Sequence, residues 1–191
     1  MGTTRLEAFS DGVIAIIITI MVLEFKIPHG EDLAALAGLL PVFLSYVLSF
    51  IFVGIYWNNH HHLLHTVKRV TGPIMWANMG LLFWLSLMPF ATGWMGENHF
   101  AKWPVVVYGI VLLLAGLSYT LLARAIIAAE GRASLLATAV GKDWKGKVSL
   151  IAYAAAILLA FLQPWISCAL YVAVAALWFL PDRRIEKTIA G

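Results

Sequence analysis

The sequence predicts an all-α integral membrane protein with six transmembrane helices in a single domain that spans residues 1–191. Hydrophobic residues make up 62% of the chain and charged residues only 12%, whereas soluble domains contain about 25% charged residues. The apolar residues form runs of the length that crosses a bilayer, about 20 residues each. Six such runs and their short connections fill the chain, so no soluble enzyme domain fits beside them.

Each helix is bounded by proline, glycine or clustered polar residues. Pro28 and Gly30, for example, end the first helix. The second helix is long for a single span, so its end is expected to project beyond the bilayer. The predicted helices cover Thr4–Phe25, Asp32–His62, Gly72–Trp94, Trp103–Ala129, Lys147–Phe161 and Trp165–Leu180.

The last two segments are predicted to form a hairpin. A continuous helix from Lys147 to Leu180 would be about 51 Å long at 1.5 Å per residue, against a hydrocarbon core of about 30 Å. Pro164 supplies the break, because proline lacks the amide hydrogen that continues a helix. A hairpin also brings the basic residues before and after the pair to the same side of the membrane.

The distribution of basic residues predicts cytoplasmic N- and C-termini. With six spans, one side carries Arg5, Lys68, Arg69, Arg124, Arg132, Lys142, Lys145, Lys147, Arg183, Arg184 and Lys187. Only Lys26 and Lys102 fall on the opposite side. Cytoplasmic loops of membrane proteins are enriched in lysine and arginine, so the basic side is expected to be cytoplasmic.

Asp11 is the most informative polar residue, because it lies about two turns inside the first apolar helix. Placing an aspartate in a spanning helix costs about 2.5–3.5 kcal/mol, so such residues need a partner or have a function. Candidate partners are Arg5, Ser10, Trp57, Asn58, Asn59, His60, His61, His62, His65 and Asn78. Two interpretations stay open: a polar network that fixes helix packing, or direct contact with a permeating ion or substrate.

The histidine run at positions 60–65 also permits a metal site, because His61 and His65 have the i, i+4 spacing of zinc ligands. However, no cysteine or carboxylate lies nearby in the sequence, and His60, His61 and His62 point in different directions on a helix. A polar network or a proton-sensitive switch is therefore favoured over a bound metal. A membrane metal carrier or enzyme that uses Asp11 and His60–His65 remains an alternative.

The first helix carries an aliphatic stripe on another face. It consists of Gly12, Ile16, Thr19, Ile20 and Leu23, at helical spacing. At about 100° per residue, Asp11 lies about 140° around the helix from Ile16, so the two point in nearly opposite directions. Lipid contact or core packing is the ordinary explanation of such a stripe.

Several function classes lack their sequence signatures. The chain has no nucleophile with a base at recognisable spacing, no phosphate-binding or dinucleotide-binding glycine motif, and no carbonyl-filter motif of the usual potassium channels. It has no surface pattern for nucleic acid. These observations predict that the chain is not an enzyme, has no cofactor and does not bind nucleic acid.

The pattern Arg5-x-x-x-Phe9-Ser10-Asp11 at the start of the first helix resembles the signature of the transmembrane protein 175 family of potassium channels. Other segments are similar to further recurring motifs of that family. They are Tyr56-Trp57-x-x-His60-His61, Asn78 and the stretch Ser86-Leu87-Met88-Pro89-Phe90. The resemblance covers all six predicted spans.

The resemblance implies a homotetramer of six-helix subunits, with the four first helices around a central pore. It places the signature network inside each subunit, at Arg5, Phe9, Ser10, Asp11, Trp57, His60, His61 and Asn78. It places a hydrophobic constriction on the opposite face, at Ile16, Ile20 and Leu23, with Thr19 beside it. This layout agrees with the angle between Asp11 and Ile16 on the helix.

The expected function is a potassium-preferring cation channel of the cell (inner) membrane, gated where a ring of isoleucines excludes water. Its partners would be the lipid bilayer, monovalent cations and three further copies of the chain, and permeant K⁺ would take the place of a cofactor. A proton-conducting channel is an alternative, because a dry isoleucine neck can pass protons along a transient file of water.

Overall fold

A computed structural model describes residues 2–131, 136–137 and 143–179 of the chain, and all regular secondary structure in them is helical. The helices are α1 (Thr3–Leu23), α2 (Leu33–Ala37), α3 (Leu40–Leu64), α4 (Gly72–Ser86), α5 (Met88–Glu97), α6 (Lys102–Glu130), α8 (Trp144–Leu159) and α9 (Pro164–Phe179). The prediction of an all-α protein is therefore confirmed.

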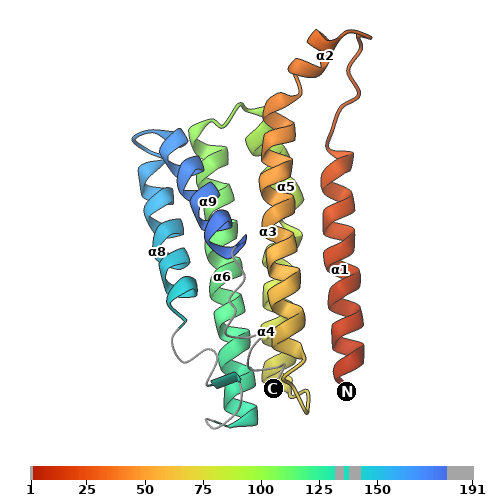
Figure 1. The fold of residues 1–191 in the computed structure, drawn as a ribbon, viewed down its shortest axis with the longest axis vertical. Helices are drawn as coiled ribbons and strands as arrows, with labels where there is room; N and C mark the ends of the chain where they lie inside the picture. Colours follow the sequence, from red (N-terminus) through yellow and green to blue (C-terminus); the bar gives the residue numbers. More distant parts are fainter. Residues whose placement is uncertain (1, 132–135, 138–142, 180–191) are drawn as a thin grey trace.

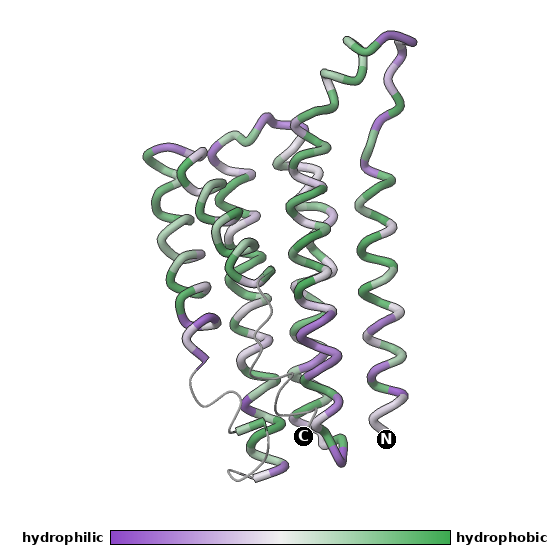
Figure 2. Tube along the Cα trace, in the orientation of Figure 1, coloured by the Kyte–Doolittle hydropathy of each residue, from purple (hydrophilic) through white to green (hydrophobic). Residues whose placement is uncertain are grey.

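The long helices stand side by side in one bundle (Figure 1). α1 is at one edge and packs on α3, α4 and α5, while α6 lies in the middle and packs on α4, α5 and α8. One end of the bundle, called the basic end below, carries Arg5, Lys68, Arg69, Arg124, Lys145 and Lys147. Figure 2 shows hydrophilic residues of α1 and α3 at the same level near this end, whereas the middle of both helices is apolar.

Four stretches are long and apolar enough to cross a membrane. They are Thr3–Leu23, Leu40–Leu64, Gly72–Glu97 and Lys102–Glu130, of which the third comprises α4 and α5. α8 and α9 are shorter, with 16 residues each, or about 24 Å of helix. The chain is thus a helical membrane protein, and the count of six spans stays a prediction.

The predicted hairpin of the last two helices is confirmed. α8 ends at Leu159 and α9 begins at Pro164, and the two helices pack against each other. Within the turn, the amide hydrogens of Leu162 and Gln163 bond to the carbonyl of Leu159 and tighten the chain reversal. The predicted end of the last helix at Leu180 lies outside the described residues, as do Arg132, Lys142, Arg183, Arg184 and Lys187.

Two predicted helices are each divided by a break that the sequence analysis missed. The predicted helix Asp32–His62 is divided at Gly38 and Leu39, and Pro41 lies in the first turn of α3. The predicted helix Gly72–Trp94 is divided at Leu87, and Pro89 lies in the first turn of α5. Proline has no amide hydrogen for the preceding turn and is tolerated at a helix start, which explains both breaks.

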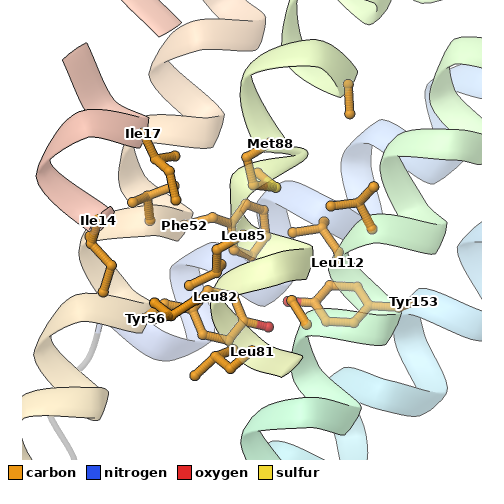
Figure 3. Packing of buried hydrophobic residues seen from close by; sticks show 14 of the residues in the cluster. Ile14, Ile17, Phe52, Tyr56, Leu81, Leu82, Leu85, Met88, Leu112 and Tyr153 are labelled. Atoms are coloured by element: carbon orange, nitrogen blue, oxygen red, sulfur yellow. The ribbon is translucent and has the colours of Figure 1, made fainter. Parts of the chain in front are cut away.

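The core lies between α1, α3, α4, α5, α6, α8 and α9. Figure 3 shows Ile17 of α1 on one side of Phe52 of α3 and Leu85 of α4, and Leu112 of α6 on the other side. These four side chains are at most 3% exposed. Because lipid is as apolar as these side chains, close packing is the stabilising factor here.

Close contact between α5 and α3 depends on Gly96. A Cβ atom at this position would lie 2.6 Å from the Val42 Cα and 2.5 Å from the Ser45 Oγ, so the two helices would have to separate. We expect Gly96→Ala to destabilise the protein by about 1–3 kcal/mol, the usual cost of overpacking. The thermal unfolding midpoint of the purified protein measures this effect.

The matched control is Gly54→Ala in α3, where a Cβ atom would meet nothing within 4 Å. This control should unfold at or slightly above the wild-type midpoint, because alanine favours the helix. Equal midpoints for both variants would show that the bundle tolerates separation of α3 and α5.

Candidate functional site at the junction of α1, α3 and α4

One face of α1 is buried against the other helices of the subunit. The buried residues are Leu6, Ser10, Ile14, Ile17 and Met21. They follow each other at intervals of three or four residues, which places them on one side of a helix. Ser10 is the polar member of this set, and it is fully buried.

The opposite face of α1 is aliphatic and exposed. Ile16 is 57% exposed, Ile20 41% and Leu23 77%, and Thr19 is exposed between them. The Thr19 hydroxyl donates to the Ile16 carbonyl within the helix. The structure thus brings these four predicted gate residues together on one face, turned away from the core of the subunit.

A fully buried hydrogen-bond network joins α1 to α4 and α3. The Asn78 Nδ2 donates to the Ser10 Oγ at 2.9 Å, and the Ser10 Oγ donates to the Leu6 carbonyl at 2.8 Å. The Asn78 Oδ1 lies 2.6 Å from the His60 Nε2. Because an amide oxygen only accepts, the proton of the imidazole is on Nε2. The His60 Nδ1 is then a buried acceptor without a partner among the described residues.

Two further contacts hold α1 to α3 closer to the surface. The Trp57 Nε1 donates to the Asp11 Oδ1 at 3.0 Å, and the His61 Nδ1 lies 3.0 Å from the Glu7 Oε1. Glu7 was not among the predicted site residues. It precedes Asp11 by four residues, and this helical spacing places both carboxylates on the same side of α1.

Arg5 and Phe9 do not join the network within the subunit. Arg5 is exposed and its guanidinium makes no hydrogen bond or ion pair with the described residues, and Phe9 is 49% exposed. Arg5, one of the candidate partners of Asp11, is therefore not paired with it within the described residues. The other six predicted network residues are Ser10, Asp11, Trp57, His60, His61 and Asn78, and they are connected as described above.

The histidine rings at the end of α3 contact one another edge to face. The rings of His61 and His65 are 4.7 Å apart and those of His61 and His62 are 5.7 Å apart, measured between centroids. No group of three or more potential metal ligands is found among the residues that the structure describes. The polar groups of the junction thus contact one another across α1, α3 and α4.

Removal of the Trp57 hydrogen bond should loosen the first turns of α1. Trp57→Phe keeps an aromatic ring and removes the donor to Asp11, so we expect a loss of about 1 kcal/mol, reduced by solvent exposure of the contact. Hydrogen–deuterium exchange should become faster in the first turns of α1. An unchanged exchange rate, with Trp76→Phe as a control at an exposed tryptophan of α4, would show that the contact does not hold α1.

Comparisons with known proteins agree with this architecture. Residues 5–89 match the family described as the endosomal/lysosomal potassium channel TMEM175. A potassium channel from Chryseobacterium is 55% identical over 189 residues, which cover 99% of this chain and 98% of that relative. The human endosomal/lysosomal proton channel TMEM175 is 38% identical over 99 residues, which cover 46% of this chain but 19% of the human protein.

A solved structure has the same fold. The crystal structure of a lysosomal potassium-selective channel TMEM175 homolog from Chamaesiphon minutus superposes with a TM-score of 0.82 at 27% identity, covering 93% of this chain and 96% of that chain. The helical bundle and these relatives define the class of the protein, which is a cation channel of the membrane and not an enzyme. Within that class, the chain belongs to the TMEM175 family.

Proposed function

We propose that the chain forms a homotetrameric, potassium-preferring channel in which four copies of α1 line the pore and an isoleucine constriction is the gate. The observation that carries this proposal is the division of α1 into two faces. One face is held to the subunit by the polar junction, and the other carries Ile16, Thr19, Ile20 and Leu23 in exposed positions. The names of the bacterial relatives support potassium as the permeant ion.

An oligomer is part of this proposal, because one copy of α1 cannot enclose a pore. Beside the aliphatic face runs a groove of about 600 Å³ between α1 and α5. It is lined by Ile16 and Ile20 on one side and by Phe90 and Trp94 on the other. An apolar groove that begins at the proposed pore face is suited to a helix of a neighbouring subunit.

The proposed gate works by exclusion of water. Four Ile16 side chains around an axis would form a narrow apolar neck, and ions would pass only when α1 moves far enough to let water enter. Without a cage of carbonyl oxygens, the preference for potassium over sodium would be modest. It would come in part from the easier dehydration of potassium.

Acidic residues at the far end of the bundle would attract cations to the mouth of the pore. Glu24 and Glu97 both line the groove that contains Ile16 and Ile20. The Lys26 ammonium lies 2.7 Å from the Glu97 carboxylate, and this hydrogen bond raises the pKa of Lys26. Lys26 offsets the charge of Glu97. Of the two acidic residues in the groove, Glu24 would therefore contribute most of the proposed attraction for cations.

The proposed orientation places the basic end of the bundle in the cytoplasm and the chain in the inner membrane of the cell. Six basic residues lie at the basic end within the described part of the chain, and Lys26 and Lys102 lie at the other. This asymmetry supports cytoplasmic termini and a sixth crossing.

Proton conduction is the second candidate function. It is favoured by the names of the vertebrate relatives, which are proton channels and align with this chain over 99 residues in the human case. The same neck could pass protons along transient water while it excludes hydrated ions.

The experiment that tests the proposal is a reversal-potential measurement on the purified protein in a planar bilayer. With potassium on one side and sodium on the other, at equal pH, we expect the reversal potential to shift toward the potassium equilibrium value. A second recording with a pH gradient and symmetrical potassium should leave it near zero. A reversal potential that follows the pH gradient would favour the proton channel, and a monomer by native mass spectrometry would contradict the tetramer.

A further inference from the structure

A second site lies on the other side of α3, away from α1. It is a cavity of about 40 Å³ among α3, α6, α8 and α9. Its walls include Phe52, Tyr56 and Asn59 of α3, Gly116 and Tyr119 of α6, and Tyr153 of α8. No residue of α1 contributes to it, so it is separate from the proposed pore.

Two hydroxyl groups in this cavity have no hydrogen-bond partner among the described residues. Tyr56 is 9% exposed and Tyr153 is 3% exposed, yet neither hydroxyl makes a hydrogen bond within the described residues. Figure 3 shows the two hydroxyl ends turned toward one another. Neither oxygen is among the fully buried atoms without a partner, so both are within reach of a water-sized molecule in the cavity. Tyrosine hydroxyls in such surroundings usually find a hydrogen-bond partner.

Other deeply buried tyrosines of the bundle are satisfied. The Tyr108 hydroxyl lies 3.0 Å from the Ser49 Oγ, and the Tyr171 hydroxyl donates to the Val105 carbonyl at 3.0 Å. Both side chains are fully buried, and the hydrogen bond of each hydroxyl compensates for the loss of water. The unpaired hydroxyls are thus a local property of the cavity, and they indicate that an occupant supplies the missing hydrogen bonds.

We propose that this cavity binds a small uncharged molecule that carries a hydroxyl group, and that water takes its place in the absence of a ligand. The volume has room for about three water molecules at 10–15 Å³ each. A hydroxyl both donates and accepts, so one group could bond to Tyr56 and Tyr153 together. The rings of Phe52 and Tyr119 would contact the apolar part of the ligand.

The charge of the cavity argues for an uncharged ligand. Among the residues that line it, Asp143 is the one with a charged side chain, and its Oδ1 accepts the Gly146 amide hydrogen at the start of α8. The rest of the lining includes hydroxyls and aromatic rings and no charged side chain. An anion in the cavity would be repelled by Asp143, and a cation away from Asp143 would lose its hydration without a partner of opposite charge.

Gly116 keeps the space open. A Cβ atom at this position would lie 3.0 Å from the Leu150 Cδ2 and 3.5 Å from the Tyr56 hydroxyl. Gly116→Ala would therefore add a methyl group at the position where the ligand is expected to contact Tyr56. This variant tests the volume of the site, whereas tyrosine-to-phenylalanine variants test its hydrogen bonds.

The test uses the full chain purified in detergent. The probe is 2-fluoroethanol, a small alcohol close in size to the cavity, and its binding is followed by fluorine NMR. We expect a saturable component of binding above the linear partition into micelles. Tyr153→Phe and Tyr56→Phe should each weaken this component about fivefold, and Gly116→Ala should weaken it further. The matched control Tyr171→Phe removes a buried hydroxyl outside the cavity and should leave binding unchanged.

The phenylalanine variants remove hydroxyls without structural partners, so their unfolding midpoints should not fall. The site would be disproved by linear partition alone in the wild type. It would also be disproved by equal weakening in Tyr171→Phe and Tyr153→Phe, because that result would place the effect in the stability of the bundle. Binding is measured without ion flux, so this test does not depend on the proposed channel mechanism.

Discussion

Ile16→Asn is expected to turn the channel into an open leak for potassium and sodium. Asparagine has as many side-chain heavy atoms as isoleucine but a smaller volume, and its amide holds water in the proposed neck. A loss of only about 1.4 kcal/mol from the dewetting barrier raises the flux about tenfold, so the effect should be large. Flux into vesicles that contain the reconstituted variant measures it, with potassium and sodium tested separately.

Ile151→Asn is the matched control for this prediction. Ile151 lies on α8 and is 70% exposed, so the same substitution there also places an amide on the surface of the bundle. The control should keep the wild-type flux. If Ile16→Asn also keeps the wild-type flux, Ile16 does not lie at the constriction, and the proposed position of the gate is wrong.

Asn78→Leu is expected to be the most destabilising substitution at the junction. It removes the acceptor of the His60 Nε2 and the donor to the Ser10 Oγ, and all three side chains are fully buried. His60 would then be buried with neither ring nitrogen paired among the described residues. We expect a loss of about 2–3 kcal/mol, since each buried group left unsatisfied costs 1–3 kcal/mol.

The thermal unfolding midpoint and the fraction of assembled protein measure this loss. Asn98→Leu is the control, because the Asn98 amide bonds to the Trp94 carbonyl at the exposed end of α5. We expect a change of less than about 0.5 kcal/mol there, as is usual at surface positions. Similar midpoints for the two variants would show that the buried network does not fix α1 to the subunit.

The helices, the two faces of the first helix and the final hairpin could be predicted from the sequence alone. The apolar runs predicted helices, and the spacing within the first helix placed Asp11 and Ile16 on nearly opposite faces. The prediction of the two faces succeeds because helical periodicity is a local property. The number of residues between two positions gives the angle between their side chains around the helix axis. The hairpin at Pro164 could also be predicted from local information, because a single continuous helix over this stretch would be longer than a bilayer is thick.

Local periodicity could not show which polar groups meet. Ten residues were candidate partners of Asp11. The structure selects Trp57 and leaves the Arg5 side chain exposed, with no partner among the described residues. The contact between Glu7 and His61 was missed for the same reason. Such pairs join helices far apart in the sequence, and their distance depends on how the helices cross and rotate.

The sequence by itself determined a helical membrane chain, a basic end, and a first helix with a polar face and an aliphatic face. The tertiary structure decided which partners hold the polar face, and it showed the breaks before Pro41 and Pro89. It also placed Tyr56 and Tyr153 around a cavity, although they are 97 positions apart in the numbering (153 minus 56). Periodicity acts within one helix, whereas a cavity exists only between helices, where the packing of separate segments leaves space.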